Sequence, residues 1–469
     1  MRGAAVLLAA LACAQPLSAQ VGSRVWRPDE RVIISDFSYV EALAVSEDVL
    51  YQATRGGLGI YDRRFARWNP PVTHLDGYPT EPVLAALVDP LDRSAWLGTG
   101  QAVLRYEPVL RLFESIPLPG GARDLMFDRD DAIRGIYLRG RRGWQFLPRG
   151  SPIPTGAASL PPAGRQVRTT TVEAVLQQVP FALARAPLTL MDERVRRYRY
   201  TAAAVAPVTD EIFFGTDGLG VLRVDAATTE VERLPFGILD RAVGAVVTVP
   251  GGVWTGTGLR GRRVGFAFVS DDVQRYEYDE GPPATGYNFR AVRDLTARGR
   301  SLWAATDAGV VRVEPRVRAE SMMTGFGLGM EDAYALAQGS QGVWVGTRSG
   351  LAFVSDDGVV TRIDDRVVDP ILALAATRDT VWVGGLRGLG VTWHGSREIV
   401  VPRDVAENVV LRGTIVALTF SADTLVAATP DRIAWRTPEG QWLIERVIAG
   451  ELGELTVLAG DVAGVWVGG

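Results

Sequence analysis

Residues 341–351 read Gln-Gly-Val-Trp-Val-Gly-Thr-Arg-Ser-Gly-Leu, and this stretch decides the fold. Its central phrase is an aromatic residue, two further residues, a Thr or Gly, then a turn and an apolar run. With the fourth residue of the phrase as an anchor, ten copies have anchors at residues 54, 99, 140, 216, 257, 306, 347, 385, 429 and 469. The spacing is about 41 residues, which indicates a repeat architecture.

One interval, between residues 140 and 216, is nearly twice as long as the others. Phe181–Ala184 has the register of the phrase, and Leu188 and Asp192 follow Ala184 at the spacing seen after Thr54. The run RVRRYRY, residues 194–200, then alternates like a strand, whereas TVEAVLQQV, residues 171–179, has a helical pattern. The interval therefore predicts an eleventh unit that is degenerate or carries an insertion.

Each unit has the content of four short antiparallel strands. In the unit of Trp344 an apolar run at 333–338 precedes the aromatic strand, and a glycine-containing turn leads to a third strand at 350–354. Strands at such even spacing, bounded by Gly, Asp and Pro, are typical of β-propeller blades. Neither helical periodicity nor leucine-rich spacing is present, so the predicted fold class is an all-β propeller of four-stranded antiparallel blades.

The aromatic residues of the repeat are predicted to fill the space between blades, because sheets that pack face to face need large flat side chains there. A carbohydrate-stacking surface is the alternative role. The residues concerned are Trp96, Trp254, Trp303, Trp344, Trp382 and Trp466.

The phrase W-x-G-T-x-x-G-L resembles the two-component regulator propeller repeat, and residues 341–351 are its best match here. Residues 73–77 and 324–328 resemble the lead-in to a blade in that family. The resemblance covers about residues 37–469, although the units at Gly140 and Ala184 lack most of the motif. It implies the periplasmic sensor region of a hybrid two-component system. Residues 34–62 equally resemble the start of two-propeller accessory proteins of type IX secretion, which implies a scaffold instead.

Propellers of that family usually have seven blades and often occur in tandem. The resemblance therefore predicts a first propeller of about seven blades over residues 20–325, with the degenerate unit around 165–200, and an incomplete second one of about four blades over 326–469. In that arrangement the Trp303 unit packs beside the Tyr51 unit, with a break near residues 318–332. A single large ring completed by residues 25–34 is the alternative. The sequence following residue 469 would distinguish a sensor from a scaffold.

The N-terminus has the pattern of a secretory signal. Arg2 precedes an apolar run at residues 4–12 that is too short to span a bilayer, and small residues follow with cleavage expected after Ala19. A lipoprotein signal with acylation at Cys13 is the alternative. Either signal predicts a periplasmic or extracellular location in the bacterial cell envelope, with no transmembrane helix in this chain.

Composition argues against several kinds of chemistry. A net charge of −4 argues against nucleic-acid binding, and one Cys and two His, far apart at His74 and His394, leave no metal or thiol centre. We therefore predict no cofactor, no metal site and no catalytic residues. A propeller-fold carbohydrate-active enzyme is the minor alternative.

Binding is the remaining function, with an oligosaccharide, another polar ligand or an envelope protein as partner. Loops that follow the anchors should lie on one face of a propeller by repeat register, and charged side chains there suit a polar ligand. The predicted ligand-binding residues are Arg55, Asp217, Asp307, Arg348, Arg387 and Asp431.

Overall fold

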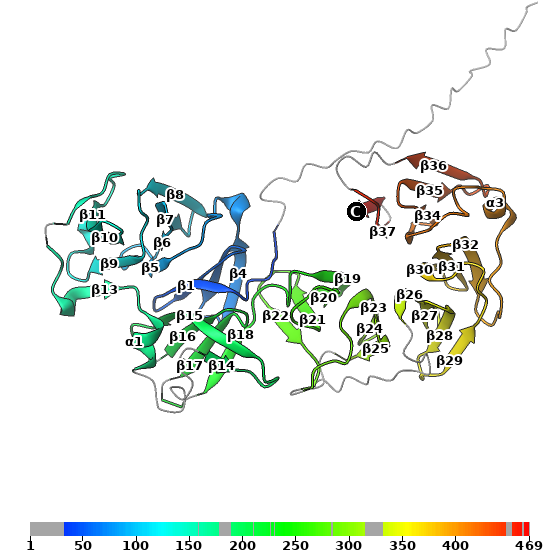
Figure 1. Ribbon diagram of the computed structural model, residues 1–469, viewed down its shortest axis with the longest axis horizontal. Helices are drawn as coiled ribbons and strands as arrows, with labels where there is room; N and C mark the ends of the chain where they lie inside the picture. The colour runs from blue at the N-terminus through cyan, green and yellow to red at the C-terminus, as the bar shows by residue number, and fades with distance from the viewer. Residues whose placement is uncertain are drawn as a thin grey trace, which may run out of the picture. The chain divides into compact units, whose positions relative to one another are not determined.

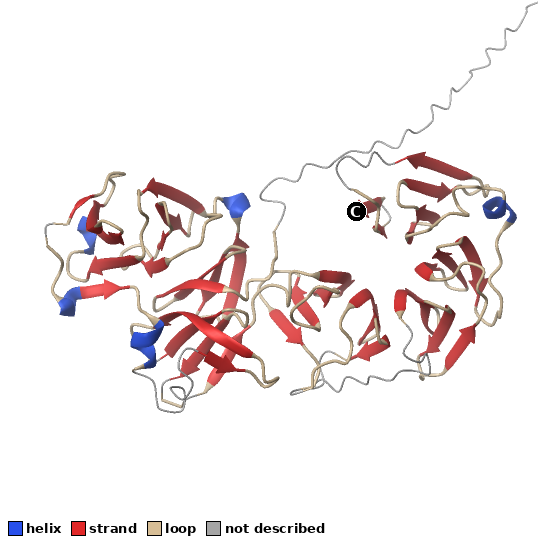
Figure 2. Ribbon diagram, in the orientation of Figure 1, coloured by secondary structure: helices blue, strands red, loops and turns tan. Residues whose placement is uncertain are grey.

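The computed structural model describes residues 32–157, 159–177, 189–209, 211–225, 227–228, 230–282, 285–314, 332–446, 453–461 and 464–468. These residues form ten antiparallel sheets with a few short helices (Figures 1 and 2). The chain is an all-β propeller, as the sequence predicts.

The first four sheets contain eighteen strands in chain order. These are β1 (Val40–Val45), β2 (Val49–Thr54), β3 (Leu58–Asp62), β4 (Arg67–Val72); β5 (Ala85–Val88), β6 (Ala95–Gly98), β7 (Ala102–Glu107), β8 (Leu112–Pro117); β9 (Asp124–Asp128), β10 (Gly135–Gly140), β11 (Gly143–Pro148), β12 (Thr155–Gly156), β13 (Gln166–Arg168); β14 (Thr189–Met191), β15 (Arg197–Val205), β16 (Glu211–Thr216), β17 (Val221–Asp225) and β18 (Val231–Leu234).

Six further sheets follow in the described part of the chain. Their strands are β19 (Val243–Val249), β20 (Gly252–Thr257), β21 (Phe266–Ser270), β22 (Tyr276–Asp279); β23 (Val292–Arg298), β24 (Ser301–Thr306), β25 (Gly309–Val313); β26 (Ala333–Gln338), β27 (Gly342–Thr347), β28 (Gly350–Ser355), β29 (Val360–Ile363); β30 (Ile371–Ala376), β31 (Thr380–Gly385), β32 (Gly388–Trp393); β33 (Ala417–Ser421), β34 (Thr424–Ala428), β35 (Arg432–Arg436), β36 (Trp442–Arg446); β37 (Val457–Gly460) and β38 (Val465–Gly468). The helices are α1 (Val172–Leu176) and α3 (Arg403–Ala406), with 3-10 turns η2 (His74–Asp76), η3 (Ala132–Arg134) and η4 (Ala163–Arg165).

The anchor threonine closes the hairpin between the second and third strands of a sheet. The Thr347 hydroxyl donates to the carbonyl oxygen of Gly350 at 2.9 Å and accepts from the Ser349 N–H at 3.2 Å. The hydroxyls of Thr54 and Thr306 make the same bond, at 2.8 and 2.7 Å. A short polar side chain that bonds its own turn stabilises the turn, which explains why the phrase ends in Thr so often.

Neighbouring sheets pack through their first strands: β15 contacts β1, β1 contacts β5, and β5 contacts β9. In the later sheets the contacts run in chain order from β19 through β23, β26, β30 and β33 to β37 (Figure 1). The residue before the anchor lies at this contact and must be small. A Cβ added to Gly346 would lie 2.5 Å from Ile371 Cγ2, and one added to Gly215 would lie 2.5 Å from Val40 Cγ1.

Five of the six repeat tryptophans are buried in the apolar clusters that join one sheet to the next. They are Trp96, Trp254, Trp303, Trp344 and Trp382. Trp466 differs from the prediction, because its side chain is 53% exposed. It lies in β38, and no further sheet covers that strand in the part of the chain that the structure describes.

The predicted contact between the Trp303 and Tyr51 units is wrong. Trp303 packs in one cluster with Ala333 and Val345 of the following sheet, whereas β1 packs against β15 and β16. The physical reason is the segment before β1, since Asp36 pairs with Gly237 and Tyr39 with Asp217, and this segment aligns β1 beside β15 and β16. The division at residues 325 and 326 lies in 315–331, outside the described residues, and stays a prediction.

The long interval of the repeat contains one helix and no additional sheet among its described residues. Residues 172–176 are helical, as the pattern predicts, and form α1. The alternating run at 194–200 belongs mostly to β15, the first strand of the Phe213 sheet, and so does not form a unit of its own. The predicted anchor Ala184, the signal sequence at 1–19 and Cys13 lie outside the described residues.

Candidate functional site

A repeated β-bulge sets which side chains face the centre of the first four sheets. In β1 the register shifts between Val40 and Ala42, and in β15 it shifts between Tyr200 and Ala202. The extra residues are Glu41 and Thr201, and both line a central cavity. A bulge turns its extra side chain out of the regular alternation of the strand, which is how these two reach the cavity.

The cavity has a volume of about 640 Å³. Its walls come from the first strands β1, β5, β9 and β15, from the end of β10, and from residues 168–173, which lead into α1. Leu84 and Arg123 line it just before β5 and β9, at the places that correspond to Glu41 in β1. The cavity is thus lined by residues of all four of the first sheets.

The cavity exists because one contact between sheets is missing. At the Gly140 anchor the preceding residue is Arg139, where nine other anchors have Gly or Ala. Arg139 lines the cavity at the position where a small residue in other units allows close sheet contact. The facing side of β15 and β16 is covered by α1 instead, with Val172 and Val175 packed against the apolar core of that sheet.

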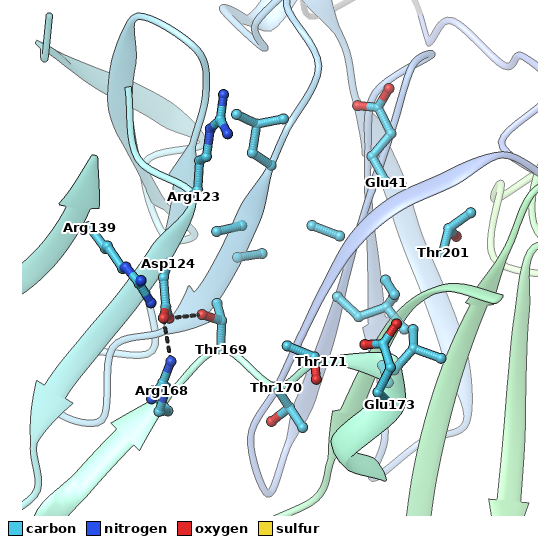
Figure 3. A pocket seen from close by; sticks show the side chains of 18 of the residues that line it. Glu41, Arg123, Asp124, Arg139, Arg168, Thr169, Thr170, Thr171, Glu173 and Thr201 are labelled. Atoms are coloured by element: carbon cyan, nitrogen blue, oxygen red, sulfur yellow. Dashed lines mark hydrogen bonds and ion pairs between the residues drawn. The ribbon is translucent and has the colours of Figure 1, made fainter. Parts of the chain in front are cut away.

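The side chains of the cavity divide into a cationic and an acidic side (Figure 3). Arg123 lies just before β9, Arg139 in β10 and Arg141 in the turn after β10, and no ion pair involves them in the described part of the chain. Glu41 and Glu173 lie across the cavity, with the Thr201 side chain on the same side. Unpaired guanidinium groups are strong donors to carboxylate, sulfate or phosphate.

A second pair of charges is already neutralised. Arg168 forms an ion pair with Asp124, and the Thr169 hydroxyl donates to the same carboxylate (Figure 3). The Thr169 hydroxyl also accepts from the Leu125 N–H at 3.3 Å. These bonds hold β13 against β9 and fix the wall beside Arg139.

Glu41 and Thr201 are positioned on the opposite side. Glu41 Oε2 accepts from the Val83 N–H at 2.9 Å, and its Oε1 lies 3.4 Å from Arg55 Nε. The Thr201 hydroxyl is buried and has no hydrogen-bond partner among the described residues. A buried hydroxyl without a partner is free to bond a ligand group.

The predicted ligand-binding residues lie at the turns after the anchors, and none of them lines the cavity. Arg55 contacts the cavity residue Glu41 and stacks over Tyr39, with 4.4 Å between guanidinium carbon and ring centre. Asp217 and Asp307 accept backbone N–H groups, from Arg199 at 2.8 Å and from Arg290 at 2.8 Å. These two carboxylates therefore brace the start of a first strand.

The other three predicted residues lie in the later sheets. Arg348 and Arg387 are exposed. Asp431 accepts from the Thr429 hydroxyl at 3.2 Å and lies 3.6 Å from Arg432 Nε. The structure does not bring the six residues together into one site.

The sequence reasoning missed Arg123, Arg139 and the acidic side, although a signal was present. The Gly140 unit departs most clearly from the repeat, with Arg139 in place of a small residue. That departure lies at the wall of the cavity, between the sheet of β9–β13 and the sheet of β14–β18.

No group of three His, Cys, Asp or Glu side chains in the described residues could hold a metal ion. Among the same residues no helix combines the length and the apolar character needed to cross a membrane.

Known proteins similar to this chain are found only among solved structures. No protein-family model matches this chain, and no curated protein is similar to it in sequence. Among solved structures, the extracellular domain of BT4673 from B. thetaiotaomicron, assigned as a hybrid two-component system, is 13% identical with a TM-score of 0.37. The match covers 92% of this chain and 63% of that domain.

Three other solved structures also match. The extracellular domain of BT3049 from B. thetaiotaomicron is 12% identical over 94% of this chain and 75% of that chain, with a TM-score of 0.37. PorZ, a surface component of the type IX secretion system of Porphyromonas gingivalis, is 10% identical over 92% of this chain and 63% of PorZ, with a TM-score of 0.25. Virginiamycin B lyase from Staphylococcus aureus is 12% identical over 57% of this chain and 90% of the lyase, with a TM-score of 0.37. The first three are the kinds of protein that the repeat resembles.

Proposed function

We propose that this chain is a non-catalytic propeller module of the bacterial cell envelope that binds a polar, negatively charged ligand in the central cavity of its first four sheets. The observation that carries the proposal is the cavity itself, where Arg123, Arg139 and Arg141 have no carboxylate partner in the described part of the chain. The sensing region of a two-component regulator is the role that fits such a module best.

The chemistry of the two sides narrows the ligand. Guanidinium groups favour a carboxylate, sulfate or phosphate, whereas Glu41, Glu173 and the Thr201 hydroxyl accept or donate hydrogen bonds to hydroxyl groups. A ligand with one acidic group and several hydroxyls, such as a uronic acid or a short acidic oligosaccharide, satisfies both sides. A cavity of about 640 Å³ is in the range of small-ligand sites.

An enzymatic role is the weaker candidate. Neither histidine lines the cavity, since His74 is in η2 and His394 packs against Phe353 at 4.9 Å between ring centres. The Glu41 carboxylate already accepts from the Val83 N–H and forms an ion pair with Arg55, which suits a residue that positions a ligand.

Calorimetric titration of the full chain tests the proposal. Uronic-acid oligosaccharides, neutral oligosaccharides and sugar phosphates serve as the ligand panel. We expect an acidic compound to bind, and Arg139→Ala and Arg123→Ala to weaken its binding at least about tenfold, since each removes a charged hydrogen bond. Arg142→Ala, next to the cavity residue Arg141 but outside the lining, is the matched control and should bind as the unmodified chain does.

Equal affinity in Arg139→Ala and Arg142→Ala would rule out the cavity as the site. A ligand that binds with undiminished affinity to both cavity variants would instead favour a surface role, as in a secretion-associated scaffold.

A further inference from the structure

A second cluster of arginines is buried between the sheet of β14–β18 and the sheet of β19–β22. Glu280 follows β22 and is 9% exposed. Its carboxylate accepts from Arg263 Nε at 2.6 Å and from Arg196 Nη2 at 2.8 Å, and Arg194 Nε lies 3.4 Å away. The single carboxylate of Glu280 thus forms ion pairs with three guanidinium groups.

The remaining carboxylates nearby are engaged elsewhere. Asp192 pairs with Arg196 at 2.8 Å, and Asp240 accepts the backbone N–H groups of Arg262 and Arg263. Asp36 accepts the Ser38 N–H at 2.9 Å. None of the three has a hydrogen bond to the terminal guanidinium nitrogens of Arg263.

Arg233 is a fourth arginine of this cluster and has no carboxylate partner in the described residues. Its Nε donates to the Leu219 carbonyl at 2.9 Å. Its guanidinium carbon lies 4.7 Å from the ring centre of Tyr278, and that of Arg263 lies 5.2 Å from the same ring. Two guanidinium groups therefore interact with the same aromatic ring, and this interaction offsets their positive charges only in part.

Three N–H donor nitrogens in this cluster are left without partners. Nη1 and Nη2 of Arg263 and Nη2 of Arg233 are buried and have no hydrogen bond in the described part of the chain. The Arg263 side chain is only 6% exposed. Buried charged donors without acceptors are costly, so a bound acceptor with negative charge would relieve both the missing bonds and the repulsion.

We propose that a small monovalent anion such as chloride binds beside Tyr278, between the terminal nitrogens of Arg263 and Arg233. A weakly hydrated anion suits this place, because the aromatic ring and the buried surroundings offer few donors beyond these three. The site is separate from the ligand cavity: none of Arg263, Arg233 and Tyr278 lines it.

The electrostatics of the cluster agree with this geometry. Burial, together with the adjacent charge of Arg263, lowers the pKa of Arg233 to about 10. Burial alone would raise the pKa of Glu280, but Arg263 and Arg196 outweigh it and lower that pKa to about 2. Glu280 is therefore fully ionised at neutral pH, and the excess positive charge stays with Arg233.

Thermal unfolding of the full chain in different sodium salts tests the site. At about 0.15 M ionic strength and one pH, chloride or bromide should raise the unfolding midpoint by about 1–3 °C over gluconate, which is too large to enter. Arg233→Met should abolish that difference, whereas Arg142→Met, at an exposed arginine, should keep it. A midpoint that is equal in chloride and gluconate for the unmodified chain would overturn the proposal, as would an undiminished chloride effect in Arg233→Met.

Crystals of the unmodified chain grown in bromide give a second test that needs no variant. Anomalous scattering should show bromide within hydrogen-bonding distance of Arg263 Nη1 or Nη2. Ordered water at that place, with bromide bound only at exposed arginines, would contradict the proposal.

Discussion

The first four sheets and the last six are built from one repeat but differ at the residue before one anchor. From β19 onward, every residue before an anchor is Gly or Ala, and each sheet packs on the next through that position. In the first four sheets Arg139 interrupts the series, and a polar cavity replaces the packing. In this repeat the regular positions thus serve packing, whereas the departure from the pattern lies at the wall of the cavity that we propose as the ligand site.

The largest expected effect concerns a regular contact. Gly346→Val should lower the free energy of unfolding by about 2–4 kcal/mol, because a Cβ there already lies 2.5 Å from Ile371 Cγ2 in a packed core. Urea unfolding measures the loss. Gly156→Val, where an added Cβ meets nothing within 4 Å, is the control and should change stability by less than about 0.5 kcal/mol. Similar losses in the two variants would refute the role of the small residue.

The next prediction compares two carboxylates that each bond a neighbouring sheet. Glu41 accepts from the Val83 N–H in the first part and has Arg55 beside it. Asp294 accepts from the Leu336 N–H at 2.7 Å and the Leu295 N–H at 2.8 Å and forms no ion pair with a described residue. Burial raises the pKa of Asp294 from 3.8 to about 6, although its two backbone bonds oppose the rise.

The pKa of Asp294 is higher in the folded chain than in the unfolded chain, so the folded state favours the protonated carboxyl. The contribution of this protonation to stability is complete below pH 3.8 and is lost as pH rises through about 6. Relative to Asp294→Asn, the unmodified chain should lose about 1–3 kcal/mol of stability between about pH 4 and pH 7.5. Urea unfolding of both proteins across this range measures the difference. If the difference in unfolding free energy between the two proteins stays constant with pH, or changes in the opposite direction, the pKa of Asp294 is not raised by folding.

A smaller effect is expected at the anchor hydroxyl, which the Gly140 unit lacks. Thr347→Val removes the bond to the Gly350 carbonyl and should cost about 1–2 kcal/mol of unfolding free energy. Thr80→Val, at an exposed position, should cost less than about 0.5 kcal/mol in the same urea titration. If both variants unfold alike, the anchor threonine has no part in holding the hairpin.

The smallest effect on stability is expected where the pattern is broken. Arg139→Ala should change the unfolding free energy by less than about 0.5 kcal/mol, because its side chain is exposed to the cavity and forms no ion pair in the described part of the chain. The same variant should lose ligand affinity in the calorimetric titration. A large loss of stability would mean that Arg139 holds the sheets together, and the contrast with Gly346 would disappear.

The class of fold is readable from the sequence, because the aromatic phrase and its turn repeat about every 41 residues and each copy specifies its own hairpin. Thr347 and Gly350 bond within four residues, so their role is readable from a local pattern. The burial of tryptophans such as Trp344 follows for the same reason, since a regular sheet needs a filled face.

Only the tertiary structure decided which sheets are neighbours and where the candidate site lies. β1 packs beside β15, more than 150 residues later, because the segment before β1 pairs with Asp217 and Gly237. Glu41, Arg123 and Thr201 come from three sheets, and their convergence depends on that neighbourhood. The repeat spacing specifies the contacts within a unit. Because the units resemble one another, the spacing does not show which sheets pack together. The candidate site depends on which sheets pack together, so the anchors alone did not reveal it.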